Sequence, residues 1–115
     1  MTVMQNSHRY KIVKNSPDLW IRKFPWKKIS GHKYSRGRVV IYGGEKEFVG
    51  ATILSSLAAL KTGTGSVKIV CKKDTIHTYS VKFPSVLKIE INNIDELKKF
   101  LVEEKITSIL IGPGA

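Results

Sequence analysis

Two glycine-rich turns are the stretches of this chain whose residue types could form a ligand site. Gly43-Gly44 follows the apolar run RVVIY, and Gly112-Pro113-Gly114 follows the apolar run ITSILI. Glycines let a chain turn sharply and let a bound molecule approach the backbone closely. A helix opening after such a turn adds free N–H groups and partial positive charge, which favour phosphate or another anion. The alternative for these turns is a purely structural role.

The first turn matches neither of two common phosphate-binding motifs. A P-loop requires a Gly-Lys pair followed by Ser or Thr, whereas Gly50 is followed by Ala51. The Rossmann fingerprint requires G-x-G-x-x-G, which the sequence Gly43-Gly44-Glu45-Lys46 does not supply. Both motifs are therefore excluded.

The elements that must position these turns alternate regularly between strand and helix. Short β-branched runs predict buried strands, and apolar residues at helical spacing predict helices. Strands are expected at 38–42, 66–71, 86–91 and 106–111, and helices at about 48–61, 74–80 and from Asn93 or Asp95 to about 104. This order predicts an α/β fold with a parallel sheet sandwiched by helices. Both glycine turns should then leave the same edge of the sheet.

Finer features of these elements are also predicted. The Gly-Thr-Gly stop at 63–65 suits a left-handed cap at the end of the first helix, and Asp74 suits an N-cap for the second. The alternating strand 86–91 is placed nearer an edge, whereas the strand 38–42 is expected to be buried on both faces and the strand 106–111 to be buried. Residues expected to pack helices against the sheet are Val49, Ala51, Ile53, Leu54, Ser55, Leu57, Ala58, Ala59, Leu60, Ile94, Leu97, Phe100 and Leu101.

Composition indicates one soluble globular domain. The chain has 115 residues, of which 42% are hydrophobic and 25% charged. The single cysteine, Cys71, cannot form an intramolecular disulfide, and its apolar surroundings favour a buried structural thiol. The sequence has no signal peptide and no apolar run near the roughly 20 residues that span a bilayer. We therefore expect a cytoplasmic protein without a membrane partner.

The net charge of +11 is concentrated near the N-terminus, where residues 1–38 carry ten Lys/Arg and one acid. Residues 1–29 form a basic arm that also contains Trp20, Phe24 and Trp26. Two interpretations compete for this arm: its aromatics dock on the domain or a neighbouring subunit, or they stack on nucleic acid. We favour docking and regard a nucleic-acid partner as the lesser alternative. His32 and Lys33 follow in a loop that either contacts an anion or is simply solvated.

Four motifs in one register resemble a known family. HKYSRGRVVIYGG, VGATILSSLAALKTGTGSVKI, FPSVL and ILIGPGA resemble the N-terminal half of the ADP/ATP-dependent NAD(P)H-hydrate dehydratases of the ribokinase-like superfamily. The resemblance covers about residues 30–115. It implies a three-layer αβα domain truncated to its N-terminal βαβαβαβ half. Family members dehydrate S-NADHX or S-NADPHX, phosphorylating the hydrate hydroxyl from ADP or ATP and then eliminating phosphate.

The resemblance also implies which residues bind the hydrate. It assigns Gly43 and Gly44 to the first glycine turn. It assigns Gly50 and Ala51 to the opening of the first long helix, with Ala51 as the contact. It assigns Gly112 and Gly114 to the Gly-Pro-Gly turn, with Gly114 as the contact. The sequence departs from the family at Tyr34, where a glycine normally follows His-Lys.

Other family motifs lie outside these 115 residues. They are a histidine-containing loop, a lysine-containing nucleotide loop, and a Gly-Thr-Gly-Asp motif whose aspartate is the catalytic base. Gly63-Thr64-Gly65 is not a substitute, because it closes a helix and is followed by Ser66. We therefore assign no catalytic residue and no metal ligand, and treat Glu45 or Glu47 only as an untested replacement base. The expectation is a truncated or split member, inactive alone, whose residues for ADP or ATP with Mg²⁺ are absent. Its expected partner is a second copy or a complementary C-terminal chain, and a non-catalytic dinucleotide- or anion-binding module remains the alternative.

Overall fold

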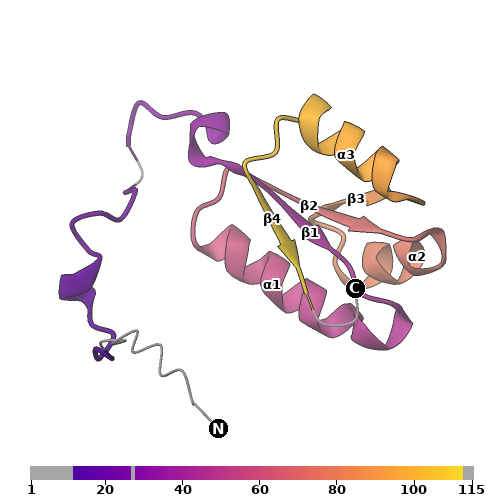
Figure 1. Ribbon diagram of the computed structural model, residues 1–115, viewed down its shortest axis with the longest axis horizontal. Coiled ribbons are helices and arrows are strands. Elements are labelled where there is room, and N and C mark those ends of the chain that lie inside the picture. The colour runs from indigo at the N-terminus through magenta and orange to yellow at the C-terminus, as the bar shows by residue number, and fades with distance from the viewer. Residues whose placement is uncertain (1–11, 27, 113–115) are drawn as a thin grey trace, which may run out of the picture.

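The computed structural model describes residues 12–26 and 28–112 (Figure 1). Its α/β body contains β1 (Arg38–Tyr42), α1 (Val49–Lys61), β2 (Ser66–Cys71), α2 (Lys73–Lys82), β3 (Leu87–Glu90), α3 (Ile94–Glu103) and β4 (Ser108–Ile111). Short 3₁₀ turns lie at Pro17–Leu19, Lys33–Arg36 and Lys46–Phe48. Every predicted strand and helix of the body is present, with boundaries close to those expected. No helix among the described residues is long and apolar enough to cross a membrane.

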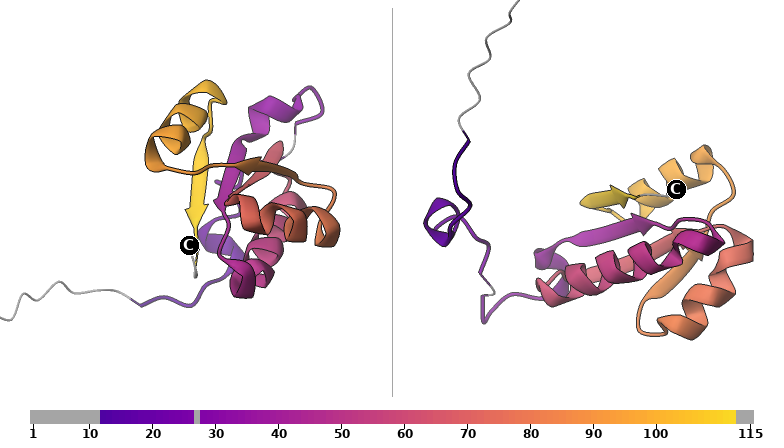
Figure 2. Two further views of the ribbon diagram at one scale, coloured as in Figure 1. Left: turned by 90° about the vertical axis from the view of Figure 1, so that its right-hand side faces the viewer. Right: turned by 90° about the horizontal axis from the view of Figure 1, so that it is seen from below.

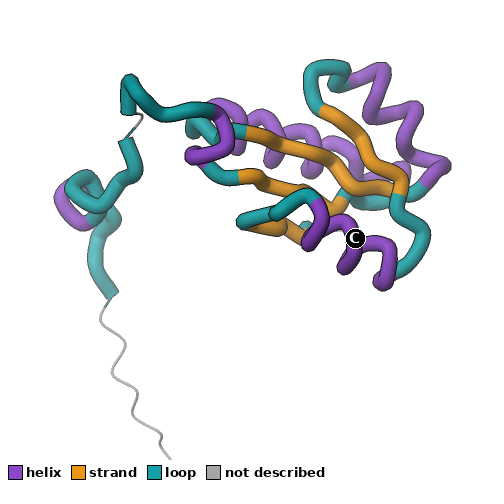
Figure 3. Tube along the Cα trace, turned by 90° about the horizontal axis from the view of Figure 1, so that it is seen from above, coloured by secondary structure: helices purple, strands orange, loops and turns teal. Residues whose placement is uncertain are grey.

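The four strands form one parallel sheet in the order β3-β2-β1-β4. The register pairs Val40 with Lys68 of β2 and with Ile109 of β4. Figure 3 shows the strands lying between helices. The parallel arrangement follows from the alternation of strands with crossover helices, because parallel neighbours need a long connection between them. The predicted parallel sheet, and the position of residues 86–91 at an edge, are confirmed.

Helices cover both faces of the sheet, which gives three layers (Figure 2). On one face, Ile41, Ile69 and Tyr79 belong to a core cluster against which residues of α1 and α2 pack. On the other face, Val40 and Val70 pack with Leu97 of α3. Alternate residues of β1 and β2 thus supply two separate cores, as the period of two in a strand requires. The three-layer αβα architecture is confirmed.

The helix ends agree only in part with the predictions. Gly63 has φ 91° and follows α1 as the expected left-handed cap. Asn93 caps α3, and its side-chain oxygen accepts a hydrogen bond from the Glu96 N–H at 2.9 Å. The prediction that Asp74 caps α2 is wrong, because Lys72 occupies that position and Asp74 lies in the first turn. The helix α2 therefore begins at Lys73, one residue before Asp74.

Three predictions about packing are also wrong. On α1 the buried residues are Thr52 and Ser56. The residues expected to pack on the sheet but found exposed are Ala51, Leu54, Leu57, Ala58 and Leu60. Ser56 donates to the Thr52 carbonyl at 2.8 Å, so small hydroxyl side chains allow the close approach of α1 to the sheet. The last strand, β4, is exposed along its whole length instead of buried, because it lies at an edge with one neighbour. Ile94 of α3 is exposed as well.

The basic arm forms its own small aromatic cluster. The Trp20 and Phe24 ring centroids are 5.9 Å apart, and those of Phe24 and Trp26 are 4.7 Å apart. All three rings are exposed, so the expected docking of the aromatics on this chain's own domain is not observed for the described residues. Docking on a neighbouring subunit, and the domain boundary at residues 29–30, stay predictions.

Candidate functional site

The two glycine turns lie at the carboxyl ends of two neighbouring strands of the sheet. β1 and β4 are parallel neighbours, and Tyr42 pairs with Ile111. Gly43 and Gly112 therefore leave adjacent strands at the same edge, as predicted. Ligands in open α/β sheets bind beyond this edge. Gly114, the expected contact in the second turn, lies outside the described residues.

The first turn is held by the chain itself. The Gly43 N–H donates to the Val70 carbonyl at 2.7 Å, and the Tyr79 hydroxyl donates to the Gly44 carbonyl at 3.1 Å. The Gly44 N–H donates to Thr52 Oγ1 at 3.3 Å. Burial raises the pKa of the Tyr79 phenol, which stays a neutral donor. Both glycines are buried, so this turn forms the floor of any site at the edge.

Tyr79 also explains why residue 43 is a glycine. A Cβ at Gly43 would lie 2.7 Å from the Tyr79 hydroxyl oxygen and 3.0 Å from its Cζ. The group that approaches this backbone closely is therefore a phenol of α2. The sequence prediction missed both Tyr79 and Thr52. Their apolar or helical surroundings gave no sign that their hydroxyls would meet one turn.

The first turn of α1 follows the glycine turn and is exposed to solvent. Gly50 and Ala51 are exposed, and a Cβ at Gly50 would meet nothing within 4 Å. Phe48 occupies the N-cap without a side-chain hydrogen bond, and the first turn of α1 has no acidic residue. The first N–H groups of a helix lack intrahelical acceptors and carry partial positive charge. The first turn of α1 itself therefore offers donors to an anion, with the exposed carboxylates of Glu45 and Glu47 just before it.

A cation and a carboxylate pair nearby at the same edge. Lys72 follows β2, and its Nζ lies 2.9 Å from Glu45 Oε1 just beyond the first turn. The hydrogen bond to Glu45 raises the pKa of the Lys72 ammonium. Glu45 is thereby engaged by a lysine, which makes it a poor replacement for a catalytic base. Glu47 lies in the short turn before α1 and is exposed.

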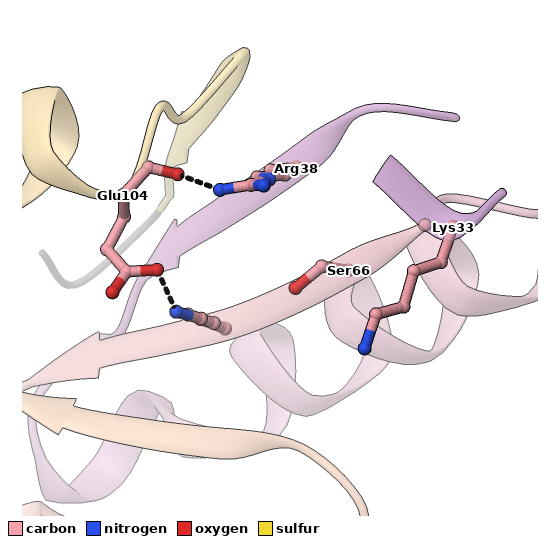
Figure 4. A pocket seen from close by; sticks show the side chains of 6 residues that line it. Lys33, Arg38, Ser66 and Glu104 are labelled. Carbon is pink, nitrogen blue, oxygen red and sulfur yellow. Dashed lines mark hydrogen bonds and ion pairs between the residues drawn. The ribbon is translucent and has the colours of Figure 1, made fainter. Parts of the chain in front are cut away.

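A small hollow lies at the other end of the strands from the glycine turns (Figure 4). It measures about 250 Å³ and is lined by Lys33, Arg38, Gly65, Ser66, Lys68 and Glu104. Arg38 and Ser66 begin β1 and β2, so the hollow lies at the amino ends of the strands. The structure therefore places Lys33 far along the sheet from the glycine turns.

The hollow is organised around Glu104. Arg38 Nη1 donates to the Glu104 carbonyl at 2.7 Å, and the Lys68 ammonium forms an ion pair with the Glu104 carboxylate. The hydrogen bond from Lys68 lowers the pKa of that carboxylate. Lys68 Nζ also lies 5.6 Å from the centroid of the Phe100 ring. These contacts tie the end of α3 to the central strands, which is a structural role.

Metal and thiol chemistry find no support in the described part of the chain. It contains no cluster of three His, Cys, Asp or Glu side chains that could hold a metal ion. Cys71 is buried, and burial raises the pKa of its thiol. A buried thiol of raised pKa is a weak nucleophile, so the expectation of a structural cysteine agrees with its position.

Known proteins share this arrangement of strands and turns. A family model described as NAD(P)H-hydrate dehydratase matches residues 39–115. The chain belongs to this family. Its match begins inside β1 and includes both glycine turns, so the elements that build the carboxyl edge are those of the family.

Individual relatives extend the comparison. The chain is 31% identical over 104 residues to the ADP-dependent (S)-NAD(P)H-hydrate dehydratase of Listeria monocytogenes, covering 90% of this chain and 36% of that protein. It is 33% identical over 85 residues to the Streptococcus pneumoniae protein of the same name, covering 74% and 29%. It is 30% identical over 87 residues to an ATP-dependent (S)-NAD(P)H-hydrate dehydratase of Danio rerio, covering 72% and 26%.

A solved structure confirms the fold class. A crystal structure of a ribokinase-like superfamily protein from Enterococcus faecalis superposes with a TM-score of 0.61 at 27% identity. The match covers 77% of this chain and 31% of the other. The chain thus spans about a third of the length of these relatives and has a ribokinase-like fold over that part.

Proposed function

We propose that this chain forms the hydrate-binding half of an NAD(P)H-hydrate dehydratase site. The observation that supports this most directly is the meeting of Gly43-Gly44 and Gly112 at one edge of a parallel sheet. The exposed start of α1, at Gly50 and Ala51, lies after the first of these turns. In this proposal the hydrated dinucleotide lies over the buried first turn, with its phosphates toward the uncapped N–H groups of α1.

Small residues are the chemical basis of the proposed site. A glycine or alanine at the rim leaves room for a large dinucleotide and exposes backbone N–H groups as donors. Gly112, where a Cβ would meet nothing within 4 Å, and Ala51 would form the two sides. Gly114 is proposed as a further contact from the family resemblance alone. These residues bind and orient, and none of them transfers a proton.

The chemical step would need residues from outside these 115. The aspartate-bearing Gly-Thr-Gly-Asp motif and the nucleotide loops of the family do not occur in the sequence. The described residues also offer no acidic cluster for the Mg²⁺ that accompanies ADP or ATP. We therefore propose that these 115 residues alone do not turn over the hydrate and need the remaining part of a dehydratase for the chemical step.

Binding tests the first part of the proposal. Ala51 and Ala58 are both exposed on α1 and lie two turns apart on the same side of the helix. Ala51→Glu places bulk and negative charge at the rim, whereas Ala58→Glu places them far from it. In calorimetric titrations with NADHX we expect Ala51→Glu to weaken binding by about tenfold or more, and Ala58→Glu to leave it unchanged. Equal affinities of the two variants would contradict the proposed site.

Turnover tests the second part. We expect no ADP- or ATP-dependent loss of NADHX with the chain alone, and loss when a complementary dehydratase fragment is added. The readout is the recovery of NADH absorbance. Binding of NADHX without turnover in any mixture would instead support a non-catalytic dinucleotide-binding module.

A nucleic-acid role for the basic arm is the less favoured alternative. Residues 30–115 make up about three quarters of the chain, so a match over 90% of it must include part of the arm. This supports an arm that belongs to the dehydratase fold and not to a separate binding module. Affinity for single-stranded DNA that falls steeply with salt and disappears on deletion of residues 1–29 would favour nucleic acid.

A further inference from the structure

A closed ring of hydrogen bonds joins Gly44 of the first turn to Thr52 of α1 and Tyr79 of α2. The Gly44 N–H donates to Thr52 Oγ1 at 3.3 Å, and the Tyr79 hydroxyl donates to the Gly44 carbonyl at 3.1 Å. The two hydroxyls also hydrogen-bond to each other. Because a hydroxyl carries one proton and Tyr79 gives its proton to Gly44, Thr52 is the donor to Tyr79. We call these three residues the hydroxyl ring.

The hydroxyl ring is shielded from water. Tyr79 is 0% exposed and Thr52 is 5% exposed, and Gly44 is buried as well. Breaking any bond of the ring would leave a buried polar group without its partner, which costs more than the bond contributes at a wet surface. The ring therefore favours one conformation of the first turn.

Apolar packing alone does not require these hydroxyls. The Tyr79 ring belongs to the core cluster with Ile41 and Ile69, where a phenylalanine ring would fill the same space. Thr52 directly follows Gly50 and Ala51 on α1. Its hydroxyl therefore ties the first turn to the exposed start of the helix, which are two parts of the proposed site.

We propose that Tyr79 and Thr52 are positioning residues for the hydrated dinucleotide. Through Gly44 they hold the first turn in place relative to the start of α1, and neither hydroxyl contacts the ligand. A ligand that meets a preorganised site loses less free energy in ordering it. This inference rests on the proposed function and adds two buried residues that set the affinity of the same site.

Calorimetric titration of the full 115-residue chain with NADHX tests the proposal. Tyr79→Phe keeps the aromatic ring but removes the donor to Gly44, and Thr52→Val keeps the side-chain shape but removes the hydroxyl. We expect each variant to bind NADHX about tenfold more weakly, because the competent conformation of the turn becomes a minor population. The double variant should lose little more than either single variant, since both break the same ring. Unchanged affinities, or losses that multiply in the double variant, would overturn the proposal.

Two further variants separate positioning from a general loss of stability. Thr52→Ser keeps the hydroxyl but removes a buried methyl group, so we expect lower stability with NADHX affinity within about twofold of the unmodified chain. Thr75→Val removes a different buried hydroxyl of α2, which donates to the Lys72 carbonyl at 3.0 Å, and should leave the affinity unchanged. If affinity instead follows the urea midpoint across all of these variants, the role of the ring is only structural and the proposal is overturned.

Amide hydrogen exchange of the ligand-free chain provides a measurement that needs no variant. We expect the Gly44 amide to exchange at least about a hundredfold more slowly than an unstructured glycine amide, because its N–H is buried and bonded. Fast exchange at Gly44 would overturn the proposal even if the variants fail to fold. If the unmodified chain does not bind NADHX, the proposed function is rejected, and the effect on affinity with it. Binding that Tyr79→Phe and Thr52→Val leave unchanged would reject this inference alone.

Discussion

Gly43 and Gly50 lie in the same strand–turn–helix segment but differ in what a side chain would meet. A Cβ at Gly43 would come within 2.7 Å of the Tyr79 hydroxyl, whereas one at Gly50 would meet open space. We expect Gly43→Ala to lower the free energy of unfolding by about 1–3 kcal/mol through overpacking. Gly50→Ala should raise it by about 0.5–1 kcal/mol, because alanine restricts the unfolded chain and favours helix. Urea unfolding of both variants checks this, and equal effects would show that the Tyr79 contact is unimportant.

The ion pair between Lys68 and Glu104 predicts a dependence of stability on pH. The hydrogen bond from Lys68 lowers the pKa of Glu104 below its ordinary 4.5 in the folded state. Its contribution is therefore complete above pH 4.5 and is lost as the pH falls through the lowered pKa. We expect Glu104→Gln to reduce the loss of free energy of unfolding as the pH falls below 4.5. Glu103→Gln is the control, because the Glu103 carboxylate lies 3.8 Å from Lys99 on the exposed surface. If Glu104→Gln loses stability with falling pH as the unchanged chain does, the role given to the Lys68–Glu104 ion pair is contradicted.

Among the secondary-structure elements, α3 has the clearest local signal for its start. The Asn93 side chain accepts from the Glu96 N–H, and the Glu96 carboxylate accepts from the Asn92 N–H at 2.8 Å. This reciprocal pattern satisfies two N–H groups at the end of the helix. We expect Asn93→Ala to cost about 1 kcal/mol, measured by urea unfolding. Asn92→Ala, which keeps the backbone donor, should stay within about 0.5 kcal/mol of the unchanged chain. The reverse order of these two effects would contradict the cap.

Segments with local signals were predictable, and those decided by neighbours were not. The strands and helices followed from apolar periodicity, and residue type narrowed the cap of α3 to Asn93 or Asp95, of which the structure has Asn93. The buried side of α1 did not, because Leu54 and Leu57 are more apolar than Thr52 and Ser56 yet lie outside. Close packing on β1 and β2 selected the smaller side chains. Likewise, the apolar run at 106–111 predicted a buried strand, but the edge position of β4 leaves it exposed.

For the molecule as a whole, we expect the stability of the α/β body not to depend on the arm. In the described part of the chain, the Trp20 indole donates to the Asn15 side chain and the Trp26 indole donates to the Ile21 carbonyl, both within the arm. We expect deletion of residues 1–29 to leave the urea midpoint of residues 30–115 nearly unchanged, since both cores lie in the body. Loss of the cooperative transition on deletion would contradict the proposed domain boundary.

The sequence alone determined the order of strands and helices, the parallel sheet, the family, and the shared edge of the two glycine turns. These depend on local periodicity and on the handed, short connections of α/β units, which a sequence carries within each segment. Only the tertiary structure decided that Tyr79 fills the space beside Gly43, that hydroxyl residues line the inner side of α1, and that β4 lies at an open edge. Such features depend on which distant segments become neighbours. Apolar character by itself does not specify the partner against which a residue is buried.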